Sequence, residues 1–246
     1  MNRDVYGEAL QDYFATGEEL SPLLLHSSYG DIEEMPIDIF FREDEDYTEL
    51  EFIALSLCDG KVLDVGAGAG THALYLQQKG FGVEALEIST VATNIMAQRG
   101  VHHIINKDIF QLQNTKYDTL LFLMNGIGLA EDIEGFKRLL KHCKSLLSTR
   151  GQLLFDSSDI SYLYEEYRIP KPDHYFGEIN YQYEYKGIKG SPFKWLYLDQ
   201  KMLIKIAREE NWVVQILFED DNDQYLVRME PRKNEKYFDK KVLTLA

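Results

Sequence analysis

The chain has 246 residues, and 26 Lys+Arg against 41 Asp+Glu give a formal net charge of −15 with histidine neutral. A field of that sign repels phosphates, so we expect no nucleic-acid partner. Hydrophobic residues make up 45% of the chain, which is enough for a buried core and excludes wholesale disorder. The two cysteines, Cys58 and Cys143, exclude a disulfide framework and fit a reducing compartment. Because the chain has no signal-peptide core and no run of about 18 apolar residues, we expect a soluble, cytoplasmic protein without a membrane partner.

Residues 1–60 predict a helical N-terminal cap. Apolar side chains recur at helical spacing from Val5, and a second helical pattern runs from Leu50 to a closing glycine, Gly60. No self-similar period is visible, so a repeat architecture is not expected. We expect the rest of the chain, 61–246, to form one domain.

Short apolar strands alternate with amphipathic helices after the cap. The predicted strands of this region are 61–65, 82–86, 103–106, 117–123 and 151–156. The helices between them start near Gly70, Ser89 and Glu131, an alternation that is typical of βαβ units on a parallel sheet. Two terminal strands, 212–220 and 223–231, flank an Asp-Asp-Asn turn and are expected to pair antiparallel. The sequence therefore predicts an α/β fold with a doubly wound, mostly parallel seven-stranded sheet whose last strand is antiparallel.

Residues 157–198 interrupt this rhythm and carry eight of the sixteen tyrosines. Apolar and polar side chains alternate from Ile179 to Tyr185 and again from Phe193 to Tyr197, which predicts an inserted antiparallel β-hairpin. One interpretation is a lid over a substrate. The other is a structural hairpin whose aromatic face completes the core.

A glycine-rich turn joins the first strand of the domain to the next helix. It reads D-V-G-A-G-A-G-T, with Gly66, Gly68 and Gly70 after Asp64. Glycines there let the backbone turn sharply and let a ligand approach the bare main chain. A dinucleotide fingerprint would place its third glycine at position 71, where this chain has Thr71.

This pattern resembles motif I of class I (Rossmann-like) S-adenosylmethionine-dependent methyltransferases, and the similarity continues at the following strand ends. Glu87 ends the second strand, at the position where the family binds the ribose hydroxyls. Asp108 follows the third strand, where the family's acid contacts the adenine amine and the next residue, here Ile109, packs on the ring. After the fourth strand, Asn125 and Gly126 hold positions that line the cofactor's methionine end.

The resemblance implies S-adenosyl-L-methionine as the cofactor, with S-adenosyl-L-homocysteine as its product. The cofactor-binding residues that it implies are Asp64, Gly66, Ala67, Gly68, Gly70, Glu87, Ile88, Asp108, Ile109, Met124, Asn125 and Gly126. The expected activity is methyl transfer to a small-molecule acceptor by in-line displacement, in which oriented binding contributes about 7–11 kcal/mol. The segment after the fourth strand lacks the N/D-P-P-Y/F tetrad of enzymes that methylate bases or amides, which again argues against nucleic acid.

The catalytic group is left open among Asp156, His26 and His174. Asp156 ends the fifth strand and faces the expected cleft, and the two histidines are considered because they lie in the presumed lids. The residues expected to contact the acceptor are Tyr13, Tyr29, Tyr183 and Trp195. Since no Cys/His cluster has metal-ligand spacing, and D-S-S-D at 156–159 is only a partial hint, we predict no metal.

Two alternatives stay open beside the methyltransferase. The first is a non-catalytic module that binds S-adenosylmethionine as a sensor or structural ligand, and the second is a nucleotide-cofactor oxidoreductase. Within the methyltransferase interpretation, methylation at oxygen, nitrogen or carbon is open, and both a monomer and a homodimer are compatible with the sequence.

Overall fold

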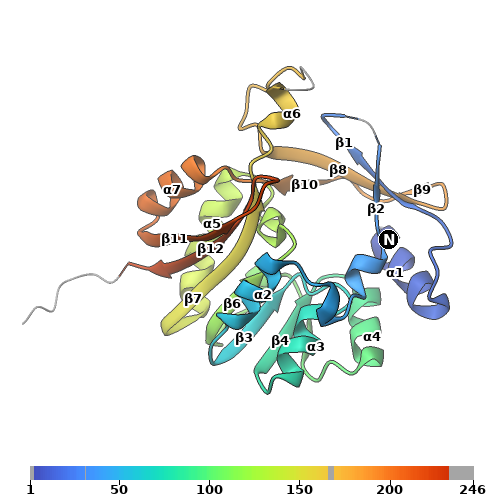
Figure 1. Ribbon diagram of the computed structural model, residues 1–246, viewed down its shortest axis with the longest axis horizontal. Helices are drawn as coiled ribbons and strands as arrows, with labels where there is room; N and C mark the ends of the chain where they lie inside the picture. Colours follow the sequence, from blue (N-terminus) through green and yellow to red (C-terminus); the bar gives the residue numbers. More distant parts are fainter. Residues whose placement is uncertain (1–2, 31, 166–168, 233–246) are drawn as a thin grey trace, which may run out of the picture.

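A computed structural model describes residues 3–30, 32–165 and 169–232 (Figure 1). The expected domain at 61–246 and the expected lid at 157–198 include residues 233–246 and 166–168, which lie outside the described residues. Among the described residues, no helix is long and apolar enough to cross a membrane.

The central sheet contains seven strands within the described residues, in the order β11-β12-β7-β6-β3-β4-β5. Its strands are β3 (Lys61–Val65), β4 (Gly82–Glu87), β5 (Ile104–Asn106), β6 (Tyr117–Phe122), β7 (Leu147–Ser158), β11 (Trp212–Glu219) and β12 (Gln224–Pro231). Strands β5, β4, β3, β6 and β7 pair in parallel, whereas β12 runs antiparallel to both β7 and β11. The predicted mostly parallel sheet with an antiparallel last strand is therefore confirmed.

Helices cover both faces of this sheet. They are α2 (Glu49–Ser56), α3 (Thr71–Gln78) and α4 (Thr90–Arg99) on one face, and α5 (Ile133–Leu146) and α7 (Gln200–Glu209) on the other. Alternate residues of one strand serve the two faces: Leu120 and Phe122 of β6 pack with α5, while Leu121 packs with α2 and α3. Such alternation follows from the two-residue period of a strand, and it explains why these strands read as continuous apolar runs.

The strand order reverses between β3 and β6. From β3 the chain proceeds outward to β4 and β5, and then returns to the other side of β3 as β6. Loops that leave two neighbouring strands in opposite directions open a crevice at the carboxyl ends of those strands, which is where ligands bind in such sheets.

A second, antiparallel sheet has the order β10-β8-β1-β2, with β9 paired to β8. It contains β1 (Leu23–Ser27), β2 (Glu33–Met35), β8 (Glu178–Tyr185), β9 (Ile188–Lys189) and β10 (Phe193–Leu196). The predicted hairpin is present as β8 and β10, but β1 from the N-terminal segment pairs with β8, with Leu24 opposite Glu184. The segment expected to be a helical cap therefore also supplies two strands of the sheet, which joins it to the insertion.

Short helices complete the N-terminal segment and the loops. They are α1 (Val5–Thr16), η1 (Asp38–Phe40), η2 (Asp44–Asp46), η3 (Ile109–Gln111), η4 (Gly126–Ala130) and α6 (Tyr162–Glu165). Asp4 caps α1 by accepting a hydrogen bond from the Gly7 amide at 2.8 Å. A Cβ on Gly7 would come within 2.7 Å of Val91 on α4, so this glycine lets the two helices approach closely. Helix α1 is thereby fixed beside the carboxyl end of β4 (Figure 1).

Candidate functional site

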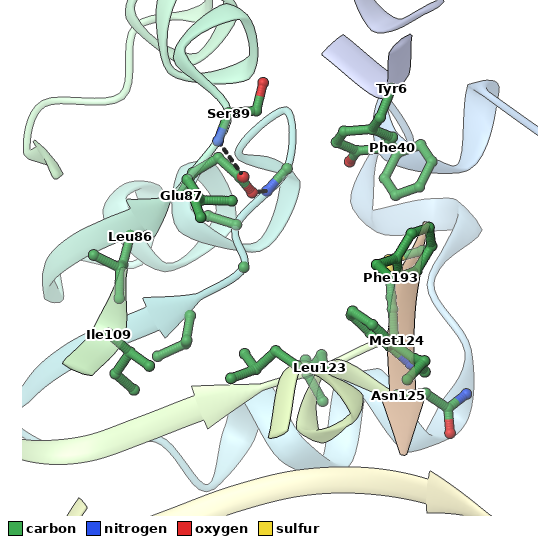
Figure 2. A pocket seen from close by; sticks show the side chains of 18 of the residues that line it. Tyr6, Phe40, Leu86, Glu87, Ser89, Ile109, Leu123, Met124, Asn125 and Phe193 are labelled. Atoms are coloured by element: carbon green, nitrogen blue, oxygen red, sulfur yellow. Dashed lines mark hydrogen bonds between the residues drawn. The ribbon is translucent and has the colours of Figure 1, made fainter. Parts of the chain in front are cut away.

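A pocket of about 1630 Å³ lies between the carboxyl ends of the central strands and the second sheet. In Figure 2, Glu87 lies on one side of this space, and Tyr6, Phe40 and Phe193 lie on the other. The carboxyl ends of β3, β4 and β6 and the segment after β5 contribute one wall, while α1, η1 and the second sheet contribute the other. The site is therefore built from segments that are far apart in the sequence.

Two of the three glycines in the turn after β3 face the pocket. Gly66 and Gly68 have φ of 73° and 55°, and a Cβ on Gly66 would meet no atom within 4 Å, so the main chain there is open to a ligand. Gly70 (φ 86°) is not a lining residue. Its Cβ would come within 2.8 Å of Val101 and 2.9 Å of Met96, so it serves the packing of α3.

The Glu87 carboxylate is held by backbone amides at the end of β4. Its two oxygens accept hydrogen bonds from the amides of Gly68 at 3.0 Å and Ser89 at 2.8 Å (Figure 2). Burial raises the pKa of Glu87, and these amides act in the opposite direction. Asp4 of the α1 cap accepts a hydrogen bond from the Ser89 hydroxyl at 2.5 Å, so the N-terminal helix is tied to the same corner.

The next corner of the pocket is largely apolar. Ile88 lines it with 72% of its surface exposed, although large apolar side chains are usually buried. Ile109 and Phe110 lie on the neighbouring segment after β5. Asp108 lies beside them, exposed, and caps η3 by accepting a hydrogen bond from the Phe110 amide at 2.8 Å. Together they form an apolar slot with one carboxylate at its edge.

The chain turns sharply where β6 ends. Met124 and Asn125 have φ of 60° and 54°, a left-handed conformation that non-glycine residues rarely adopt. The turn points the backbone N–H of Asn125 at Asp156, whose Oδ2 accepts this hydrogen bond at 2.8 Å. The same oxygen accepts a second hydrogen bond from the Gln224 side chain at 2.7 Å. Gly126 follows as the first residue of η4 and also lines the pocket.

Two buried carboxylates belong to residues that line the pocket. In each, one oxygen accepts no hydrogen bond from the described residues. These oxygens are Oδ2 of Asp64, at the end of β3, and Oδ1 of Asp156, at the end of β7. Burial raises the pKa of both side chains to about 6. Each of these two carboxylates therefore has one buried acceptor oxygen without a hydrogen bond from the described residues.

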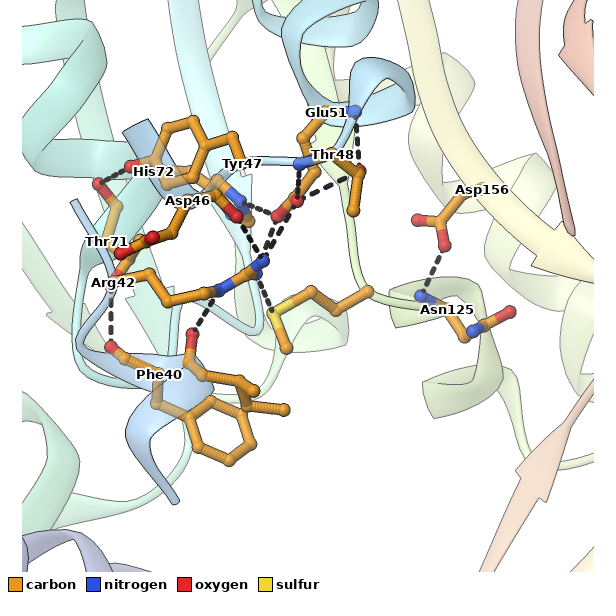
Figure 3. A network of polar contacts seen from close by, with 12 residues as sticks. Phe40, Arg42, Asp46, Tyr47, Thr48, Glu51, Thr71, His72, Asn125 and Asp156 are labelled. Carbon is orange, nitrogen blue, oxygen red and sulfur yellow. Dashed lines mark hydrogen bonds and ion pairs between the residues drawn. The ribbon is translucent and has the colours of Figure 1, made fainter. Parts of the chain in front are cut away.

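A network of Arg42, Glu51 and His72 borders the same space (Figure 3). Arg42 donates to both Glu51 oxygens, at 2.8 and 3.2 Å, and His72 Nε2 lies 2.8 Å from Glu51 Oε1. Burial tends to raise the pKa of Glu51, but the His72 contact and the Arg42 charge outweigh it and lower the pKa to about 2. The sequence analysis missed this network. Its one visible signal is the capping box at the start of α2, where Thr48 and Glu51 bond each other reciprocally.

Aromatic side chains of the second sheet close the pocket on the side away from Glu87. Those that line it are Tyr181, Tyr183, Phe193, Trp195 and Tyr197. The Tyr6 ring on α1 stacks on Tyr183 with a centroid distance of 5.7 Å, and Trp195 packs against Gly128 of η4, where a Cβ would collide with the indole. The absence of a side chain at Gly128 therefore lets β10 dock onto the loop after β6.

Besides Gly70, four of the predicted residues lie outside the pocket lining. Tyr13 packs on Phe41 with a centroid distance of 5.0 Å, and Tyr29 lies behind Tyr181, with a distance of 3.1 Å between their hydroxyl oxygens. The remaining two are histidines: His26 bonds Glu184 at 2.8 Å within the second sheet, and His174 is exposed on the segment before β8. Of the three catalytic candidates, the structure places only Asp156 in the pocket. No group of three potential metal ligands occurs in the described part of the chain.

The chain matches the model of a family described as a methyltransferase domain over residues 42–203. It is similar to the S-adenosylmethionine-dependent methyltransferase of Bacteroides fragilis solved in complex with S-adenosyl-L-homocysteine, with 34% identity, a TM-score of 0.85, and coverage of 94% of this chain and 95% of that one. The CcbJ methyltransferase of Streptomyces caelestis has 12% identity, a TM-score of 0.63 and coverage of 93% and 98%. The PH0226 protein of Pyrococcus horikoshii OT3 has 17% identity, a TM-score of 0.59, and coverage of 77% of this chain and 94% of that one. These two lower identities show a shared fold alone, and no curated protein matches the chain.

Proposed function

The chain belongs to the methyltransferase-domain family as an S-adenosylmethionine-dependent enzyme, and from this premise we propose that it methylates a small-molecule acceptor held under the second sheet. The observation that carries the proposal is the pocket's two-ended construction. One end has the glycine turn and Glu87 at the end of β4, Asp156 at the end of β7 lines the other, and aromatic residues of β8 and β10 line the wall opposite these strands.

The first end fits the cofactor. We assign the Glu87 carboxylate to the ribose hydroxyls, Asp108 to the adenine amine, and the apolar side chains of Ile88 and Ile109 to the faces of the adenine ring. The exposed Ile88 supports this, since a flat apolar ligand would cover it. Gly66, together with Ala67 and Gly68, leaves the main chain bare for a ligand to approach.

The methionine part of the cofactor fits beside β3 and β6. We assign its ammonium group to Asp64, whose Oδ2 has no hydrogen bond among the described residues. The segment Met124, Asn125 and Gly126 would contact the methionine chain. Gly70, which the motif also includes, packs α3 against α4 and contacts no ligand in this assignment.

Bound S-adenosylmethionine supplies a methyl group on a positively charged sulfonium, which an acceptor atom attacks in line while the carbon–sulfur electron pair stays on sulfur. The chain's own contribution is to hold the acceptor in line and to exclude water. The second sheet supports both tasks, because Tyr183 and Trp195 line the same pocket as Asp156 and Asn125. An acceptor that must lose a proton would use Asp156, which is the one of the three catalytic candidates that lines the pocket.

The proposal is tested by the fate of a labelled methyl group. The purified protein is incubated with methyl-labelled S-adenosylmethionine and a whole-cell extract that still contains RNA, protein and small metabolites, and the products are separated by size. We expect the label in the small-molecule fraction. Label that enters the RNA or protein fraction instead would overturn the assignment of a small acceptor.

A further inference from the structure

Asp156 is the feature of the acceptor end that the fold alone does not explain. The residue is 0% exposed. Its Oδ2 accepts two hydrogen bonds, one from the backbone amide of Asn125 and one from the side-chain amide of Gln224. Oδ1 has no partner among the described residues although the residue lines the pocket. Figure 3 shows one carboxylate oxygen directed at the Asn125 amide and the other turned away from it. A buried acceptor left without a donor destabilises the folded state, and more so when it is charged, so we expect a ligand to supply a donor to Oδ1.

The nearby charges make this place attractive to a cation. Glu51 acts on Asp156 as a second negative charge from the other wall of the pocket. The neighbouring cation, Arg42, is fully engaged: it donates to Glu51, to the carbonyls of Ile39 and Asp46, and approaches the Met124 sulfur at 3.9 Å. Arg42 is therefore not free to bind an anionic acceptor.

Aromatic side chains line the pocket that contains Asp156. Tyr183, Phe193 and Trp195 do so from the second sheet, and Tyr197 lies close enough to Asp156 for the two groups to interact electrostatically. Aromatic faces attract ammonium groups, most strongly when the pair is desolvated. A carboxylate and aromatic rings that line one pocket select for charge as well as for shape.

We propose that the acceptor is an organic amine that binds as its ammonium form, with an N–H group donating to Asp156 Oδ1 and the aromatic side chains of β8 and β10 enclosing the rest. The inference rests on the proposed function and names its substrate class. Before attack, one N–H bond breaks: the proton passes to Oδ1, which becomes a carboxyl group, and the electron pair remains on nitrogen as the nucleophile. Asp156 is ionised at neutral pH and can take this proton, because its pKa is raised only to about 6.

The test compares matched probes on protein saturated with S-adenosyl-L-homocysteine. Sets of amines, alcohols and carboxylates on the same aromatic, cyclic and linear skeletons are titrated by calorimetry, and methyl transfer to each set is followed with labelled S-adenosylmethionine. We expect the best amine to bind at least tenfold more tightly than its matched alcohol or carboxylate, and to receive the methyl group on nitrogen. A preference for alcohols or carboxylates, or no binding by any amine, would overturn the inference.

Two variants test whether amine affinity depends on Asp156 itself or only on the overall negative charge of the protein. Asp156→Asn should weaken amine binding at least tenfold while the Kd for S-adenosyl-L-homocysteine changes by less than twofold. Glu184→Gln is the control for the lost negative charge, because Glu184 lies on β8 of the second sheet but its carboxylate bonds His26 outside the pocket lining. Amine affinity that is unchanged in Asp156→Asn would contradict the assignment. If the wild type fails to bind S-adenosyl-L-homocysteine, the cofactor assignment fails instead.

A second comparison needs no variant and decides the matter even if Asp156→Asn does not fold. The best amine is compared with its trimethylammonium analogue, which keeps the charge but has no N–H donor. Because Oδ1 accepts a hydrogen bond in our proposal, the amine should bind at least tenfold more tightly. Equal affinity would mean that charge alone is recognised and that Oδ1 is not the acceptor.

Discussion

At the scale of single residues, the site contains several groups in unfavourable states that their neighbours hold in place. Met124 and Asn125 both adopt left-handed backbone, which costs of order 1–3 kcal/mol at each non-glycine residue. The Asp156 carboxylate accepts the Asn125 amide and so stabilises that turn. Asp64 and Asp156 themselves are buried with an unused oxygen each. Such features are expected where a ligand completes the structure.

Substitution of Glu87 tests the ribose assignment. Glu87→Ala removes a carboxylate proposed to accept two hydroxyl hydrogen bonds, and losing such charge-assisted bonds costs about 2–4 kcal/mol. We expect the Kd for S-adenosyl-L-homocysteine to rise by about 30-fold or more, measured by calorimetry. Glu84→Ala is the control, since Glu84 lies on the same strand but bonds Tyr117 and Lys61 away from the pocket. An affinity that stays within about twofold in Glu87→Ala would show that the assignment is wrong.

The buried Asp64 predicts a pH-dependent stability. Its pKa is about 6 in the folded protein, against an ordinary value of 3.8, so the folded state binds the proton more tightly than the unfolded state does. The free energy of unfolding should therefore fall as pH rises from about 4 to above 6, by about 3 kcal/mol at this site. Asp64→Asn removes this effect, so we expect chemical denaturation to give a gain of about 2–3 kcal/mol at pH 8 and little gain at pH 4. An equal gain at both pH values would contradict this cause.

At the scale of elements, the docking of β10 onto η4 positions the sheet that we propose covers the acceptor. Trp195 on β10 packs where Gly128 has no side chain, and β8 and β1 continue the same sheet into the N-terminal segment. The wall over the acceptor is thus one sheet made from two distant parts of the chain. Its position depends on the contact with the loop after β6.

Gly128→Ala should displace this wall. The new Cβ would collide with the Trp195 indole, so β10 must move away from η4, whereas the glycine turn and Glu87 of the cofactor end lie on other elements. We expect methyl transfer to the acceptor to fall at least tenfold, with the Kd for S-adenosyl-L-homocysteine changed by less than threefold. Gly82→Ala is a matched control, because a Cβ there meets nothing within 4 Å. Full activity in Gly128→Ala would show that the contact does not set the acceptor wall.

The sequence predicted those elements whose signal is local. The strands of the central sheet read as short apolar runs between helices, and the glycine turn, Glu87 and Asp108 occur at successive strand ends, so the fold class is confirmed and the motif residues other than Gly70 line one pocket. Strands β1 and β2 were missed because β1 pairs with β8, which lies far along the chain, and β2 in turn pairs with β1. For the same reason no pattern could place Arg42 beside Glu51, or His26 away from the pocket in a pair with Glu184.

At the scale of the whole molecule, shape and charge agree with the proposed ligands. The pocket lies where the strand order of the central sheet reverses, and α1, η1 and the second sheet cover it. The formal net charge of −15 produces a field that attracts cations. Both S-adenosylmethionine, which carries a sulfonium, and an amine acceptor would approach with the help of this field.

The central claim is that this pocket binds S-adenosylmethionine, and calorimetric titration of the purified protein with S-adenosyl-L-homocysteine tests it most directly, with NADH as a comparison. The bare glycine turn and Glu87 predict micromolar binding of S-adenosyl-L-homocysteine and no binding of NADH, because Thr71 replaces the third glycine of a dinucleotide site. Binding of NADH alone, or of neither ligand, would contradict the account.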